Sequence, residues 1–147
     1  MNRDELISAC KIFFEEKAEI YHIDCAFLYG SWARGHPLEE SDVDLALFFS
    51  PEPSSDDEIF NVITDISYHL SMNTGFEVNT IALHHDFRKP MLYYNAIVLG
   101  IPVYIRENER YIGLRNQAIA QMEDFSLFGT DWQLELARKN LEVLRNA

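Results

Sequence analysis

Cysteine, basic residues and long hydrophobic runs are all scarce in this 147-residue sequence. The two cysteines, Cys10 and Cys25, lie among apolar neighbours, which is typical of buried free thiols and argues against a disulfide or metal framework. No apolar run approaches the roughly 20 residues that a membrane-spanning helix needs. The first residues, Met1 to Glu5, show no signal-peptide pattern. We therefore expect a cytoplasmic protein that has no membrane partner.

Positive charge is the second shortage. The sequence has 12 Lys and Arg against 24 Asp and Glu, which gives a formal net charge of −12. A nucleic-acid binder usually presents a basic face, so nucleic acid is not expected as a ligand. The acidic surface suits a basic protein partner, although ordinary solvation explains it equally well. There is no internal repeat, low-complexity tract or linker, so we expect a single domain over residues 1–147.

The stretch that carries chemistry lies between two apolar runs. The first run, 26–29, ends at Gly30, and the second run, 45–49, follows Asp42 and Asp44. Successive side chains alternate between the faces of a strand, so the two aspartates share one face. Their Cα atoms would then be about 7 Å apart. At that separation both carboxylates reach one divalent cation.

The glycine turn predicts an anion site beside this acid pair. Gly30 allows a tight turn and the close approach of a ligand. Ser31 is placed to begin a short helix, whose free N–H groups favour phosphate, and Arg34 adds a charged donor one turn later. A phosphate site next to metal-binding acids is typical of metal-assisted nucleotidyl transfer. The alternative is a strand, a turn and a strand with a solvated acid pair, which the buried-strand pattern disfavours.

Two segments carry a family resemblance: Tyr29-Gly-Ser-Trp-Ala-Arg-Gly35 and Ser41-Asp-Val-Asp-Leu45. Together they resemble the signature of the DNA polymerase β-like nucleotidyltransferases, and in particular the minimal nucleotidyltransferases (MNT). The resemblance implies an α/β nucleotidyltransferase fold with a small mixed sheet flanked by helices. It also implies Mg²⁺ held by Asp42 and Asp44, and ATP held through Gly30, Ser31 and Arg34.

The third strand departs from the family pattern. MNT proteins usually place a third carboxylate there, but in the run 76–83 that position is Asn79, with Glu77 on the same face. A neutral asparagine weakens metal binding and removes a possible general base. Three interpretations stay open: Glu77 substitutes for the missing acid, turnover is slow, or the protein binds without reacting.

The resemblance also suggests a partner. Stand-alone MNT proteins of this size resemble the antitoxins of HEPN-domain RNase toxins, which transfer AMP to a toxin tyrosine or simply bind the toxin. Our leading hypothesis is an antitoxin that adenylylates a HEPN toxin. A degenerate nucleotidyltransferase that only binds is the alternative that Asn79 favours. A small-molecule nucleotidyltransferase is a third hypothesis, but such enzymes usually carry an additional domain for which this chain is too short.

The rest of the chain predicts helices and one further strand. We expect helices packed mainly on one side of the sheet, with an aromatic break between the last two and an edge strand before them. Core packing is the default for the apolar stripes of the last two helices, and a partner-docking face is the alternative. His36 and the run His84-His85-Asp86 are interpreted as loop residues. The expected helices span 3–18, 56–72, 90–99, 109–124 and 131–146, the edge strand spans 102–106, and the break spans 125–129.

Overall fold

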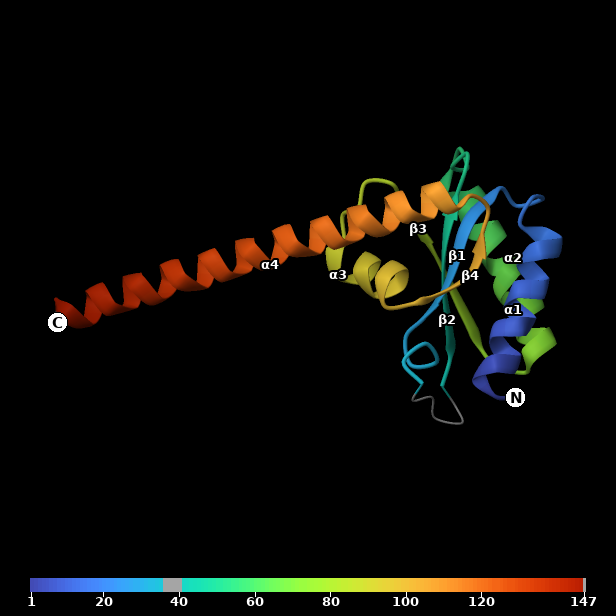
Figure 1. Ribbon diagram of the computed structural model, residues 1–147, viewed down its shortest axis with the longest axis horizontal. Coiled ribbons are helices and arrows are strands. Elements are labelled where there is room, and N and C mark those ends of the chain that lie inside the picture. The colour runs from blue at the N-terminus through green and yellow to red at the C-terminus, as the bar shows by residue number, and fades with distance from the viewer. Residues whose placement is uncertain (36–40, 147) are drawn as a thin grey trace.

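The computed structural model describes residues 1–35 and 41–146, and its centre is a four-stranded mixed sheet (Figure 1). The strand order is β3-β2-β1-β4. β1 pairs antiparallel with both β2 and β4, while β2 and β3 run parallel. β4 lies at an edge of the sheet, as the sequence predicts. The strands are β1 (Ile23–Tyr29), β2 (Val43–Phe49), β3 (Val78–Leu83) and β4 (Ile101–Ile105).

The described ranges contain five helical segments that pack on the sheet or lead away from it, and several follow from local signals. Ser55 caps the second helix, because its hydroxyl accepts a hydrogen bond from the Glu58 N–H at 3.2 Å. Gly75 ends that helix with φ of 78°, a conformation that favours glycine. The helical segments are α1 (Arg3–Lys17), α2 (Asp56–Thr74), α3 (Pro90–Tyr93), the π-helical turn η1 (Tyr94–Val98) and α4 (Asn108–Arg145).

Helices cover both faces of the sheet, so the expectation that they pack mainly on one side is wrong (Figure 1). The cause lies in β1, which carries buried apolar residues on both faces. Ala26 and Leu28 pack with α1 and α2, whereas Cys25 and Phe27 pack with η1 and the start of α4. Two hydrophobic cores result, one on each side of the sheet.

The predicted break at 125–129 is also wrong, because α4 continues without interruption from Asn108 to Arg145 (Figure 1). No proline lies between these two residues, and each of the two internal glycines, Gly113 and Gly129, costs a helix only about 1 kcal/mol. Leu114 and Ala118 anchor the first turns in the core. The remainder of α4 extends away from the sheet.

The distal part of α4 does not pack in the core, contrary to our default interpretation. Several of its large apolar side chains are exposed, including Leu127 (63%), Trp132 (57%) and Leu141 (63%). No helix in the described ranges combines the length and the apolarity that crossing a bilayer requires.

The helix expected over 90–99 forms, but its second half is π-helical. Pro90 begins the segment, and the Leu99 N–H donates to the Tyr94 carbonyl at 3.2 Å, five residues earlier. Gly100 follows because no side chain fits there. A Cβ atom at that position would lie 2.1 Å from the Ala96 carbonyl oxygen.

Both cysteines are buried free thiols, as the sequence predicts. Cys10 and Cys25 lie in the two different cores. Burial raises the pKa of each thiol to about 12, with the charge of Asp24 contributing at Cys25. These thiols are therefore protonated and unreactive at neutral pH.

Candidate functional site

Three strand ends converge at one edge of the sheet. β1 ends where β2 and β3 begin, because β1 is antiparallel to β2 and β3 is parallel to it. In the sheet register Tyr29 pairs with Asp44, and Asp44 pairs with Asn79. The glycine turn, the acid pair and the third strand therefore lie side by side.

Gly30 and Asp44 are in direct contact. Gly30 has φ of 76°, which an L side chain rarely adopts, and a Cβ atom there would lie 2.5 Å from Asp44 Oδ2. Glycine is thus required both by the backbone conformation and by the close approach of the carboxylate.

The acid pair has the arrangement that strand alternation predicts. Val43 is fully buried between the exposed Asp42 and the half-buried Asp44. Burial raises the pKa of Asp44, the charge of Asp42 raises it further, and the Arg34 guanidinium lowers it. Two carboxylates that repel each other in this way favour a shared cation.

Asn79 contacts the acid pair directly. Its Nδ2 donates to Asp42 Oδ2 at 3.2 Å. Glu77 precedes β3, and its carbonyl accepts from the Val43 N–H at 2.8 Å, which fixes the parallel register. Asn79 therefore places a neutral amide beside the acid pair.

The helix expected to begin at Ser31 does not form, and residues 30–35 are a turn. The Arg34 N–H donates to the Gly30 carbonyl at 3.1 Å, but Gly35 then adopts φ of 78° and ends the turn. Burial of Trp32 holds the turn in place, because its ring packs on Phe76 with centroids 5.0 Å apart. Phosphate binding would therefore depend on the N–H groups of a turn, without the dipole of a helix.

Gly30, Arg34 and Asp44 line one pocket of about 260 Å³. Arg34 Nε also lies 3.4 Å from the Gly30 carbonyl oxygen, which keeps the guanidinium at the turn. Ser31 is half-buried in the same turn. The remaining residues that line the pocket are Tyr29, Ala33, Leu92, Asn95 and Leu99.

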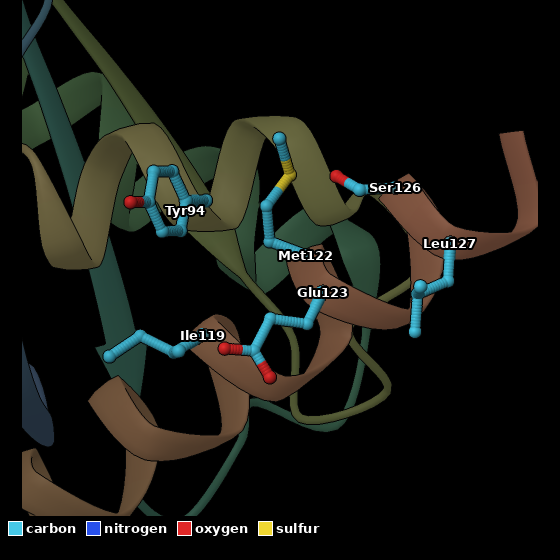
Figure 2. Close-up of a pocket in the computed structure, with 6 residues that line it drawn as sticks. All are labelled: Tyr94, Ile119, Met122, Glu123, Ser126 and Leu127. Atoms are coloured by element: carbon cyan, nitrogen blue, oxygen red, sulfur yellow. The ribbon is translucent and has the colours of Figure 1, made fainter. Parts of the chain in front are cut away.

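A larger hollow of about 530 Å³ lies between η1 and α4, away from the predicted site residues (Figure 2). Figure 2 shows Tyr94 from η1 on one side and α4 side chains such as Met122 and Leu127 on the other. Its lining is mainly apolar and carries one carboxylate, that of Glu123. Because it lacks paired acids and cations, this hollow is unsuited to phosphate chemistry.

The carboxylates present fit a magnesium ion. Mg²⁺ is commonly held by one or two carboxylates together with phosphate oxygens of the substrate, and Asp42 and Asp44 supply two. Over residues 1–35 and 41–146 no group of three or more His, Cys, Asp or Glu residues is placed to hold a metal. This result agrees with a site that the substrate phosphates would complete.

Other expected residues lie away from this pocket. His84 and His85 follow β3 in a loop, as predicted, with ring nitrogens 3.9 and 4.0 Å from Glu52 Oε1. His36 lies outside the described residues, so the loop interpretation of that residue is untested.

Sequence reasoning missed a buried charge cluster. Asp24 in β1 is fully buried, and its carboxylate accepts from Arg106 Nε at 3.1 Å. Arg110 Nε lies 2.6 Å from the other oxygen, an ion pair without hydrogen-bond geometry. The available signal was an aspartate inside an apolar strand, which requires a cationic partner. The cluster ties β1 to the start of α4.

Residues 10–109 match the family described as Polymerase beta, Nucleotidyltransferase, and the chain belongs to this family. The matched range contains all four strands and the glycine turn. It defines the fold as the α/β nucleotidyltransferase fold that the motifs predicted. None of the curated proteins matches the chain.

Solved structures add a likeness to MNT antitoxins at low identity. One is a toxin-antitoxin with AMP-PNP, with 12% identity, 92% of this chain and 98% of that chain covered, and a TM-score of 0.64. A second is a tri-AMPylated Shewanella oneidensis HEPN toxin in complex with MNT antitoxin, with 9% identity, 88% of this chain and 98% of that chain covered, and a TM-score of 0.61. A third is the toxin-antitoxin MntA-HepT, with 10% identity, 86% of this chain and 96% of that chain covered, and a TM-score of 0.60. Identities this low show a shared fold alone.

Proposed function

We propose that this chain is an MNT-type antitoxin that transfers AMP from ATP to a tyrosine hydroxyl of a cognate HEPN RNase toxin and so neutralises the toxin. The observation that carries this proposal is the placement of Gly30, Arg34 and Asp44 in one pocket, next to Asp42, in a chain of the nucleotidyltransferase family. One of the similar structures contains AMP-PNP and another contains an AMPylated HEPN toxin, which supports the choice of nucleotide and acceptor.

Each site residue has a role in this chemistry. Asp42 and Asp44 would hold Mg²⁺, which neutralises charge on the phosphates when it is bound. The turn at Gly30 and Ser31 together with the Arg34 guanidinium bind the β- and γ-phosphates. The tyrosine hydroxyl oxygen bonds to the α-phosphorus and releases its proton to solvent, the bond from that phosphorus to the bridging oxygen breaks, and pyrophosphate leaves.

The distal part of α4 supports a protein acceptor. It presents apolar side chains that the sheet does not cover, such as Leu134 (61% exposed) and Val143 (69% exposed). An isolated helix with exposed apolar residues is marginal in water, and packing against another element stabilises it. A toxin docked on α4 would bring its acceptor hydroxyl to the chain before the chemical step.

Intact mass of the toxin tests the proposal. The cognate HEPN protein is incubated with this chain, ATP and Mg²⁺, and we expect mass increments of one AMP each. Asp42→Asn combined with Asp44→Asn should abolish the increments while the complex still forms. An unmodified toxin that nevertheless binds stably would contradict the transfer reaction.

That outcome would favour a second function, inhibition by binding only. The observation behind this alternative is Asn79, which places a neutral amide where the family usually has an acid and which contacts Asp42. Restoring the acid with Asn79→Asp separates the two functions. We expect faster AMP transfer from this variant if the wild-type site is active but short of one carboxylate, and no transfer from either protein if binding alone neutralises the toxin.

A further inference from the structure

The pocket beside Asp44 has a second wall that the motif residues do not explain. Leu92 of α3, Asn95 of η1 and Leu99 form this wall and line the same pocket as Tyr29. Two aliphatic side chains and a tyrosine suit contact with the apolar face of a flat ring. The wall therefore offers space for a group that is neither phosphate nor metal.

The fold holds Asn95 at this wall. Its neighbours Ala96 and Ile97 are fully buried, whereas Asn95 itself is exposed and lines the pocket. Close approach to the sheet fixes the π turn, since a Cβ atom at Gly100 would lie 2.9 Å from the Leu28 carbonyl oxygen. π-helical turns are frequent at functional sites, because the extra residue redirects a side chain.

The carboxamide of Asn95 fits adenine better than guanine. Asn95 offers an N–H donor and a C=O acceptor side by side, and it makes no hydrogen bond with the described residues. Adenine presents an amino donor at N6 beside the acceptor N7, which an asparagine pairs with through two hydrogen bonds. Guanine presents two acceptors, O6 and N7, at the same edge.

We infer that Asn95 is a specificity-determining residue that reads the base of the bound nucleotide and selects adenine over guanine. This inference rests on the proposed function, because it requires a nucleotide whose phosphates face Gly30 and Arg34. The base then lies between Leu92, Leu99 and Tyr29, and the amide pairs with its polar edge.

Equilibrium binding of the full-length chain tests the assignment in the presence of Mg²⁺. The probes are ATP, GTP and inorganic tripolyphosphate, which has phosphates but no base. Asn95→Leu keeps the side-chain size and removes both hydrogen-bonding groups. Asn116→Leu, which changes an exposed asparagine of α4, is the matched control. We expect Asn95→Leu to reduce the preference for ATP over GTP by about 10-fold and to leave tripolyphosphate affinity unchanged, and we expect the control to behave as wild type.

Three results would overturn the inference. One is an unchanged preference for ATP in Asn95→Leu, and another is a wild-type chain that binds ATP and GTP equally. The third is an equal loss of ATP and tripolyphosphate binding, which would mean that the substitution disrupts the whole pocket. In each case AMP transfer to the toxin by the wild-type chain could still occur, so the proposed function would stand. A wild-type chain that binds none of the three probes would instead overturn both proposals.

Discussion

At the residue scale, the site contains charged groups whose positions lower the stability of the folded protein. Asp44 is a half-buried carboxylate next to a second acid, and both burial and the charge of Asp42 raise its pKa. Arg34 offsets this only in part. An arrangement that is unfavourable in the isolated protein and favourable with a cation is typical of a binding site.

The raised pKa of Asp44 predicts the sign of its effect on stability. A carboxyl group whose pKa is higher in the folded state contributes stability below its unfolded pKa, and that contribution is lost as pH rises through the folded pKa. Asp44→Asn mimics the protonated group, so we expect it to raise Tm at pH 7. The gain should vanish below about pH 4, where the wild-type carboxyl is protonated in both states.

Thermal unfolding across this pH range checks the prediction, with Asp131→Asn on exposed α4 as the control for net charge. A Tm of Asp44→Asn at pH 7 that is equal to or below the wild-type value would show that burial and repulsion do not govern this carboxylate.

Gly30 provides a second prediction, because its substitution carries two separate costs. Gly30→Ala forces an alanine into a positive φ and brings Cβ to 2.5 Å from Asp44 Oδ2. Gly75→Ala has a nearly identical φ of 78° but no atom within 4 Å of the new Cβ. We expect Gly75→Ala to cost about 1 kcal/mol and Gly30→Ala to cost more and to abolish nucleotide binding.

Urea denaturation of both variants and a nucleotide-binding assay make the measurement. Equal losses of unfolding free energy in the two variants would mean that Asp44 does not abut the glycine turn.

At the element scale, the sequence predicts the helix ends that local residue patterns determine. Ser55 and Glu58 mark the start of α2, and Gly75 marks its end, because capping depends on residues three or four apart. The convergence of Gly30 and Asp44 was also predictable, since the two segments of the family signature contain the end of β1 and the start of β2. The roles of these residues in catalysis remain predictions.

The wrong or missing predictions concern features that depend on contacts between residues far apart in the sequence. The expected helix at Ser31 does not form because Trp32 is buried against Phe76, which lies 44 residues later in the sequence. Gly35, with its positive φ, then ends the turn. Asp24 pairs with Arg106, which lies 82 residues later in the sequence. No local pattern shows these contacts, and tertiary packing overrides propensity.

The continuity of α4 is testable at Gly129. This glycine has no positive φ and no atom within 4 Å of a built Cβ, and the same is true of Gly113 earlier in α4. In a continuous helix each alanine substitution should stabilise α4 by about 0.5–1 kcal/mol. Circular dichroism at 222 nm during thermal unfolding measures the effect. A destabilising Gly129→Ala beside a stabilising Gly113→Ala would mean that the helix is broken at residue 129.

At the scale of the whole molecule, the chain has two structurally distinct parts. Residues 10–109 match the nucleotidyltransferase family and contain the pocket with Asp44. α4 begins at the edge of that range and carries exposed apolar residues far beyond the sheet (Figure 1). The hollow between η1 and α4 lies where the two parts meet (Figure 2). This arrangement separates the proposed chemical step from the proposed docking of the toxin.

The division predicts that docking can be removed without loss of the fold. We expect a combined Trp132→Gln, Leu134→Gln and Leu141→Gln variant to keep the wild-type Tm, because these side chains are exposed. Nucleotide binding should also be unchanged, since none of the three lines the pocket with Asp44. The complex with the toxin should weaken by at least about 10-fold, because three apolar side chains would no longer be buried on binding.

Co-purification and titration calorimetry with the cognate toxin check this prediction. The matched control replaces three exposed polar residues of the same helix, Gln133→Ala, Glu135→Ala and Arg138→Ala, and should bind as wild type. Full toxin affinity in the variant with Trp132, Leu134 and Leu141 replaced would place the interface elsewhere on the molecule. Weakened binding together with slower AMP transfer, at unchanged nucleotide affinity, would show that α4 delivers the acceptor to the site.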